Sequence, residues 1–410
     1  MQHMLYLEPS PEDSRWRRRH VLQTAAAFVA GGAAAAFLAT RTQQPVPPPA
    51  AGLATQPAPS SPLPSAPTVF PTRKDMVLGC TFNDGYESDQ RQVMNRHFNM
   101  LVPEYSLKMG ALLQPDGRYD FSLAERELGF AAASSKASVG HTLVWHRHLP
   151  AGLDQATDVP TLRQRLETHI PLVVTRTHQR VRLWDVVNEA IHIDDGRADG
   201  LRKSPWLKAF GPDYVSHAFQ LARASGPDRL LMYNDFDVWY DTPAHTRKRK
   251  ALLHLLERAL RRGAGIDVLG VQGHLDASET RFSEKTFARF LTQVSQLGLA
   301  VLVTELDVRD HKLRGSIAQR DLAVAAHARG FLDVVLAQPD CLGVVCWGLS
   351  DRNSWLQRDF QRPDGLPLRP LPFDLALSPK PLWHTLVQAL DNAPSRSAKA
   401  KALIRQCLTA

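Results

Sequence analysis

Two stretches, LWDVVNE at residues 183–189 and VLVTELD at residues 301–307, decide how we interpret this chain. Each is a short apolar run with several β-branched residues, which is typical of a buried strand in a parallel sheet. Each then ends in an acid, Glu189 in the first stretch and Glu305 in the second. Acids at the carboxyl ends of two buried strands predict a shared site at one edge of a parallel sheet.

Six further runs of the same kind alternate with longer amphipathic segments. The predicted strands span residues 77–82, 98–102, 138–144, 182–188, 230–233, 268–272, 300–306 and 342–347. The predicted helices span residues 89–97, 123–135, 159–179, 213–224, 243–262, 284–297, 317–337 and 380–389. Eight such units predict an α/β fold, a single (β/α)8 TIM barrel. An open doubly wound sheet is the rival, but no G-x-G-x-x-G follows the first strand, so a dinucleotide-binding fold has little support.

Composition and charge exclude several classes of protein. Of the 410 residues, 44% are hydrophobic and 22% charged, which suits a globular domain with a sizeable core. The longest apolar stretch, residues 24–39, is shorter than the roughly 20 residues that a membrane-spanning helix needs, so a polytopic membrane protein is excluded. The net charge of +8 resides in residues 1–74 and 392–410, and the part between them is neutral. We therefore expect no nucleic-acid partner.

The chain divides into four segments. Residues 1–40 resemble a twin-arginine export signal, because RRHVLQ at 18–23 precedes a weakly hydrophobic Ala/Gly stretch. The signal is either cleaved or kept as an anchor, and we expect a periplasmic or extracellular protein. Residues 41–72, rich in Pro, Ala and Ser, predict an extended linker. The barrel then occupies 73–392, and a solvated basic tail occupies 393–410.

The four cysteines are too few and too scattered for a disulfide framework. Cys341 and Cys346 belong to one predicted strand, which would hold them too far apart to bridge. We interpret Cys80 and Cys346 as small buried residues and leave their redox state open. The cysteines show no metal-ligand spacing, and we expect neither a metal nor a cofactor.

Two glutamates on roughly opposite sides of a barrel mouth suit hydrolysis of a glycosidic bond. One carboxylate attacks the anomeric carbon while the other carries the proton for the leaving oxygen, about 5 Å away. Because side chains alternate along a strand, Glu305 and Asp307 are expected to share a face while Leu306 points into the helical layer. We assign the proton to Glu189 and the attack to Glu305.

Further motifs give these strand ends a family resemblance. They are GHTLVWH at 140–146, DVVNE at 185–189, YND at 233–235, QGHL at 272–275, TELD at 304–307, WGLSD at 347–351, SW at 354–355 and PKP at 379–381. In this order, from about residue 75 to 391, they resemble glycoside hydrolase family 10, the family of endo-1,4-β-xylanases. The resemblance implies a retaining mechanism on a polysaccharide, xylan or xylo-oligosaccharides, with Glu189 as acid and then base and Glu305 as nucleophile.

The resemblance also implies how the neighbouring residues act. Asn188 is placed to hydrogen-bond a sugar 2-hydroxyl, and His274 and Asp307 to support the nucleophile. The implied substrate-binding residues are Glu104, Lys108, His141, Trp145, Asn188, Gln272, His274, Trp347 and Trp355. The indoles of Trp145, Trp347 and Trp355 would form flat walls against sugar rings, whereas we assign Trp184 and Trp383 to the core.

The second strand end departs from the family pattern. Tyr105 stands where the family has asparagine, and Met109 where it has tryptophan. The loss of the asparagine amide weakens the binding of a more distant sugar, or the phenol of Tyr105 binds a decorated or different sugar instead. Two other functions therefore stay open: a hydrolase of another β-linked glucan or glycoside, and a carbohydrate-binding barrel without catalysis. We expect a monomer.

Overall fold

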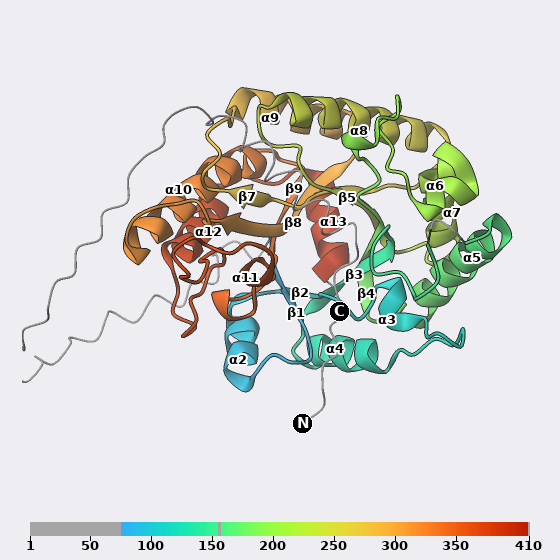
Figure 1. The fold of residues 1–410 in the computed structure, drawn as a ribbon, viewed down its shortest axis with the longest axis horizontal. Coiled ribbons are helices and arrows are strands. Elements are labelled where there is room, and N and C mark those ends of the chain that lie inside the picture. The colour runs from blue at the N-terminus through green and yellow to red at the C-terminus, as the bar shows by residue number, and fades with distance from the viewer. Residues whose placement is uncertain (1–74, 155–156, 409–410) are drawn as a thin grey trace, which may run out of the picture. The chain divides into compact units, whose positions relative to one another are not determined.

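The computed structural model describes residues 75–154 and 157–408, which form a closed parallel barrel surrounded by helices (Figure 1). The strands follow the order β6-β5-β4-β3-β2-β1-β9-β8-β7, and β6 also pairs with β8, which closes the barrel. All the pairings are parallel. The prediction of a (β/α)8 barrel is confirmed.

Strand and helix bounds follow the predicted pattern with small shifts. The strands are β1 (Val77–Phe82), β2 (Met100–Pro103), β3 (Ala137–Val144), β4 (Val181–Asn188), β5 (Leu230–Asp235), β6 (Val268–Val271), β7 (His274–Asp276), β8 (Ala300–Arg309) and β9 (Cys341–Cys346). The helices are α2 (Ser88–His97), α3 (Met109–Leu112), α4 (Ser122–Ala133), α5 (Val159–Arg176), α6 (Pro205–Phe210), α7 (Tyr214–Ser225), α8 (Pro243–Arg261), α9 (Glu284–Gln296), α10 (Ile317–Leu336), α11 (Leu356–Asp359), α12 (Pro381–Asn392) and α13 (Ala398–Leu408). The sixth predicted strand, 268–272, corresponds to β6, and Gly273, with a φ of 81°, separates β6 from the short strand β7, which was not predicted.

Side-chain alternation divides the buried apolar residues into two layers. In β1, Val77 faces the barrel interior and Leu78 packs in the layer between the sheet and the helices. Trp184 and Trp383 also lie in this outer layer, fully or almost fully buried, which confirms their assignment to the core. The four cysteines are buried thiols.

The C-terminal segment differs from its prediction. Residues 393–410 were expected to form a solvated basic tail, but α13 packs under the strands, and Ala400, Ile404 and Cys407 join the interior cluster of the barrel. Arg396 is buried and donates hydrogen bonds to the carbonyl oxygens of residues 336, 338, 341 and 394. The expectation of a solvated tail is therefore wrong: the basic residues hid a three- to four-residue apolar spacing that is typical of an amphipathic helix.

The predicted export signal and linker lie outside the described residues. Within the part of the chain that the structure covers, no helix is both long and apolar enough to span a membrane.

Candidate active site

A register shift in β8 turns Glu305 into the barrel mouth. Val301 and Val303 face the helical layer, so strict alternation would send the side chain of Glu305 there as well. The pairing of β8 with β9 shifts between Val303 and Leu306, and beyond the shift Leu306 faces the helices. Bulges of this kind re-aim side chains beside active sites. Glu305 and Asp307 therefore point inward, and the prediction that Leu306 points into the helical layer is confirmed.

A similar shift in β4 precedes the other acid. Pairing between β4 and β5 is irregular between Asp185 and Val187, after which Asn188 turns inward beside Asn234. Glu189 follows with a φ of 58°, a left-handed conformation that is uncommon outside glycine. Both acid-bearing strands thus change register just before the site.

The carboxylate of Glu305 is held at both oxygens. Asn234 Nδ2 donates to Oε1 at 2.7 Å, and His274 Nε2 donates to Oε2 at 3.1 Å. The carbonyl oxygen of the Asn234 side chain accepts from Thr304 Oγ1 at 2.7 Å, which fixes the orientation of its amide. Glu305 is buried, with 4% of its surface exposed. These contacts fix the direction of its oxygens.

His274 stays protonated beside two carboxylates. Its Nδ1 donates to Asp307 Oδ1 at 2.9 Å, and the other oxygen of Asp307 accepts from Trp355 Nε1 at 2.8 Å. Burial lowers the pKa of His274, but Asp307 and Glu305 outweigh burial and raise it to about 10. A positive imidazolium therefore faces Glu305 over the neutral pH range.

Side-chain amides connect the two glutamates. Gln272 Nε2 lies 3.1 Å from Glu189 Oε1 and 3.2 Å from Asn188 Oδ1. The same Asn188 oxygen accepts from Asn234 Nδ2, which also holds Glu305. The structure thus brings both acids into one hydrogen-bonded network at the carboxyl ends of β4, β5, β6 and β8.

The charge state of Glu189 depends on two basic neighbours. His146 Nδ1 and Arg202 Nη2 each lie 3.9 Å from Glu189 Oε2. Burial raises the pKa of Glu189, whereas charges on His146 and Arg202 lower it, to about 2. Burial, followed by Arg202, lowers the pKa of His146 well below 6.5, so the imidazole is neutral at neutral pH and Arg202 is the charge that remains. Arg202 therefore opposes the effect of burial on Glu189 in the substrate-free site, and the proton on Glu189 stays a prediction.

Lys108, a buried lysine in the segment after β2, lies within the electrostatic influence of Glu104, Glu189 and Glu305. Lys108 is buried, and burial lowers its pKa, while the nearby Glu104, Glu305 and Glu189 act to raise it. Burial likewise raises the pKa of Glu104, which accepts a hydrogen bond from Asn83 at 3.5 Å. Lys108 is therefore a third positive group near these acids, beside His274 and Arg202.

His141 sits beside another buried acid. Its Nδ1 lies 2.8 Å from Asp185 Oδ2. Burial lowers the pKa of His141 to about 4 and raises that of Asp185 well above 3.8. A neutral imidazole at this position can accept or donate a hydrogen bond to a sugar hydroxyl.

Three indoles, those of Trp145, Trp347 and Trp355, contact polar groups of the site, and their role as walls against sugar rings stays a prediction. The ring of Trp347 lies 5.1 Å from His141, and the ring of Trp355 lies 5.3 Å from His274, both edge to face. Lys108 Nζ lies 4.9 Å from the ring of Trp145. The aromatic rings thus contact the same polar groups that hold or neighbour the acids.

The two departures from the family pattern lie at one end of the site. The ring of His148 stacks on Trp145 at 5.2 Å, and the ring of Tyr105 meets His148 edge to face at 5.4 Å. Tyr105 is exposed, whereas Met109 is buried in the core. Tyr105 is therefore placed to meet a ligand, and Met109 is not.

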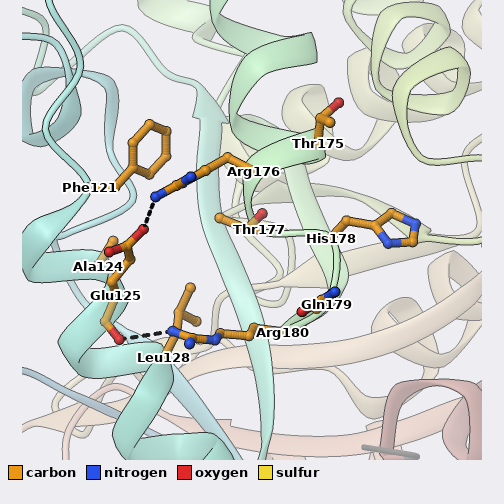
Figure 2. A pocket seen from close by; sticks show the side chains of 10 residues that line it. All are labelled: Phe121, Ala124, Glu125, Leu128, Thr175, Arg176, Thr177, His178, Gln179 and Arg180. Carbon is orange, nitrogen blue, oxygen red and sulfur yellow. Dashed lines mark hydrogen bonds and ion pairs between the residues drawn. The ribbon is translucent and has the colours of Figure 1, made fainter.

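A separate hollow of about 650 Å³ lies on the outer surface between α4 and the end of α5 (Figure 2). Phe121 lines one side, and Arg176 and Arg180 both bond to Glu125, through its side chain and its backbone carbonyl. None of the residues that line this hollow belongs to the site around the two glutamates.

Several residues of the site carried no predicted role. Asn234 was noted only within a motif, and Asp185, His146, His148 and Arg202 were not assigned. Their side chains reach the acids only through the closure of the barrel and through the loop after β4. The available signals were Asn234 at the carboxyl end of a predicted strand and the motifs that contain Asp185 and His146.

Comparisons with known proteins agree with this geometry. The model of the family "Glycosyl hydrolase family 10" matches residues 71–389. The chain is 31% identical over 301 residues to endo-1,4-β-xylanase B of Thermotoga neapolitana, covering 73% of this chain and 83% of that protein. It is 32% identical over 340 residues to a thermostable celloxylanase of Thermoclostridium stercorarium, covering 76% of this chain and 84% of that protein. The crystal structure of xylanase 10B from Thermotoga petrophila RKU-1 in complex with xylobiose is similar with a TM-score of 0.69 and 30% identity, covering 77% of this chain and 94% of that one.

Proposed function

We propose, from the premise that this chain belongs to glycosyl hydrolase family 10, that it is an endo-1,4-β-xylanase. The observation that carries the proposal is the hydrogen-bonded network at the barrel mouth, which holds Glu305 at both oxygens and joins it to Glu189 through Asn234, Asn188 and Gln272. Membership of the family makes the chain a glycoside hydrolase. The substrate is a xylan chain or a xylo-oligosaccharide.

The first step uses both glutamates. The Glu305 carboxylate attacks the anomeric carbon while the glycosidic C–O bond breaks, and Glu189 gives its proton to the departing oxygen. A covalent glycosyl ester of Glu305 results. The positive charge that develops on the sugar ring faces the Glu305 carboxylate. Asn234 and His274 hold the two oxygens of that carboxylate before the reaction, so the side chain of Glu305 needs little reorganisation.

The second step reverses the roles. Glu189, now an anion, takes a proton from water as that water attacks the anomeric carbon, and the bond to Glu305 breaks. The product keeps its β-configuration because two displacements occur. Asn188 is placed to hydrogen-bond the 2-hydroxyl, a contact that strengthens as the oxocarbenium-like transition state forms.

Glu189 must gain its proton with substrate bound. In the free site the carboxyl is ionised, because Arg202 and any charge on His146 lower its pKa. A sugar bound at the barrel mouth displaces water from Glu189. This strengthens the effect of burial, which raises the pKa of Glu189. The proton is thus taken up in the enzyme–substrate complex.

A second candidate is hydrolysis of a β-1,4-glucan. A relative that is 32% identical is named a celloxylanase, and the exposed phenol of Tyr105 lies at one end of the site. An aromatic face holds xylose and glucose rings alike, because it contacts C–H groups rather than particular hydroxyls.

Product analysis separates these functions. The wild-type protein is incubated with xylan, cellulose and aryl β-glycosides, and the released sugars are identified. A mixture of xylo-oligosaccharides from xylan supports endo-1,4-β-xylanase activity, whereas release from cellulose alone supports the glucan candidate. Glu305→Ala, with an unchanged circular dichroism spectrum, should abolish turnover of an aryl β-xyloside. Retained turnover would remove Glu305 from the nucleophile role, and binding of sugars without turnover by the wild type would support a non-catalytic barrel.

We also propose that the protein is exported as a monomer by the twin-arginine route to the periplasm or the medium. The support is the RRHVLQ sequence at 18–23 with the Ala/Gly stretch after it. Replacing Arg18 and Arg19 by lysine should leave xylanase activity in the cytoplasmic fraction, and unchanged export would contradict the proposal. Size-exclusion chromatography with light scattering tests the monomer.

A further inference from the structure

A buried cation in an outer helix plays no part in the mechanism described above. Lys248 lies in α8, is only 5% exposed, and places Nζ 2.7 Å from Asp235 Oδ1 at the end of β5. The inward face of α8 is otherwise apolar beyond its first turns, with Leu252, Leu255 and Leu256 in the core. Burying an ion pair costs desolvation energy that an apolar pair would not cost, so its presence calls for a role other than stability.

Asp235 connects this lysine to the backbone that follows Glu189. Its Oδ2 accepts from Tyr233 Oη at 2.6 Å and from the Ile191 amide at 3.4 Å. Burial and Asp235 raise the pKa of Tyr233 well above 10, so the phenol keeps the proton that it donates. Tyr233 Oη in turn accepts from the Ala190 amide at 3.1 Å.

The amide of Glu189 itself donates to the carbonyl oxygen of Asn234 at 2.9 Å. The three consecutive backbone amides of residues 189–191 therefore donate hydrogen bonds to three consecutive residues of β5, 233–235. This pattern anchors the loop after β4 at the point where the chain leaves the barrel.

The anchored residue is strained. Glu189 has a φ of 58°, a left-handed conformation that is unfavourable for a non-glycine residue and persists only where the surrounding structure holds it. The three amide hydrogen bonds impose it here. A small rotation at Glu189 would move its carboxyl away from Gln272 and from the leaving oxygen, and proton transfer depends steeply on such distances.

We propose that Lys248 is a positioning residue for proton donation by Glu189, acting through Asp235 and Tyr233. The proposal rests on the proposed glycosidase function. The Lys248 ammonium holds Oδ1 of Asp235, so that Oδ2 stays directed at Tyr233 and Ile191. Without that contact the buried carboxylate loses a hydrogen-bonding partner and can turn away, so Tyr233 and the Ile191 amide lose a fixed acceptor, and the Ala190 amide loses the fixed position of the Tyr233 hydroxyl.

The dependence of kcat/KM on the leaving group of the substrate distinguishes a positioning role of Lys248 from a merely structural one. A dinitrophenolate departs without a proton, whereas a phenolate needs proton donation in the first step. We therefore expect Lys248→Met to lower kcat/KM for a phenyl β-glycoside at least tenfold and to change kcat/KM for the dinitrophenyl β-glycoside less than threefold. Lys248→Arg retains the charge and should keep both values within threefold of the wild type.

A control is provided by a less buried ion pair between a helix and the start of a strand at the other end of the barrel. Arg223 in α7 lies 2.7 Å from Asp267, just before β6, and contacts none of the site residues. Arg223→Met should lower the melting temperature and leave the ratio of kcat/KM for the two leaving groups unchanged.

The outcomes separate the two claims. Both rates are measured on whichever aryl glycoside the wild-type enzyme hydrolyses, so the ratio tests Lys248 even where the preferred sugar is not xylose. An equal loss on both substrates, or no loss on either, overturns the role of Lys248. Absence of xyloside hydrolysis by the wild type overturns the xylanase proposal alone.

Discussion

Replacing Ile404 by alanine should destabilise the barrel and leave catalysis intact. Ile404 lies in α13 with 3% of its surface exposed, and its side chain packs into the interior cluster of the barrel, against residues of the strands. The strands are hydrogen-bonded in a closed ring, so they cannot move inward to fill the space that the lost carbons leave. Replacing a buried isoleucine by alanine lowers the free energy of unfolding by about 2–5 kcal/mol. Because the surrounding strands are rigid, we expect a loss of about 3–4 kcal/mol rather than the lower end of that range.

Thermal unfolding measures this cost. A loss of about 3–4 kcal/mol lowers the melting temperature of a domain of this size by roughly 6–8 °C, at about 2 °C per kcal/mol. Lys401→Ala, on the exposed face of the same helix, is the matched control and should change the melting temperature by less than about 1 °C. At 25 °C, kcat/KM of Ile404→Ala should equal that of the wild type, because Glu189 and Glu305 lie at the carboxyl ends of the strands and α13 lies under the opposite ends.

Two results would refute this reasoning. An unchanged melting temperature for Ile404→Ala would mean that α13 does not fill the barrel. A large loss of kcat/KM at a temperature where the variant is fully folded would mean that the two ends of the barrel are coupled rather than independent.

Two other predictions concern the site itself. Tyr105→Ala should lower the ratio of kcat/KM for an aryl β-xylobioside to kcat/KM for an aryl β-xyloside by about twofold to twelvefold, since an aromatic contact contributes about 0.5–1.5 kcal/mol. Turnover of the one-sugar substrate should not change, and an unchanged ratio would place the second sugar away from Tyr105. His274, whose pKa rises from 6.5 to about 10 on folding, contributes stability that is complete below pH 6.5 and is lost as the pH approaches 10. The free energy of unfolding in urea should therefore fall between these pH values, less steeply in His274→Gln, and equal slopes in both proteins would contradict the assigned charge.

Local pattern predicted most of the elements of this barrel. Each of the eight predicted strands overlaps an observed one, because a short run of β-branched residues between amphipathic segments has few other ways to bury itself. The short strand β7 was not predicted, since three residues after a glycine are too few to show a strand pattern. The helix at 398–408 was not predicted, because its lysines suggested a solvated tail. Lysine side chains can nevertheless lie along an apolar surface with their alkyl stems while the charge stays in water.

The sequence by itself determined the class of elements, their order and the family, and it supplied the prediction that Glu189 and Glu305 are the two reacting acids, because these follow from residue types at short spacing. Only the tertiary structure decided where the side chains point. Alternation alone would have sent Glu305 to the same side as Val301 and Val303, and a register shift against β9 reverses it. Likewise Asn234 reaches Glu305 from another strand, and Lys248 reaches Asp235 from an outer helix, since closure of the barrel brings together groups that no local interaction relates.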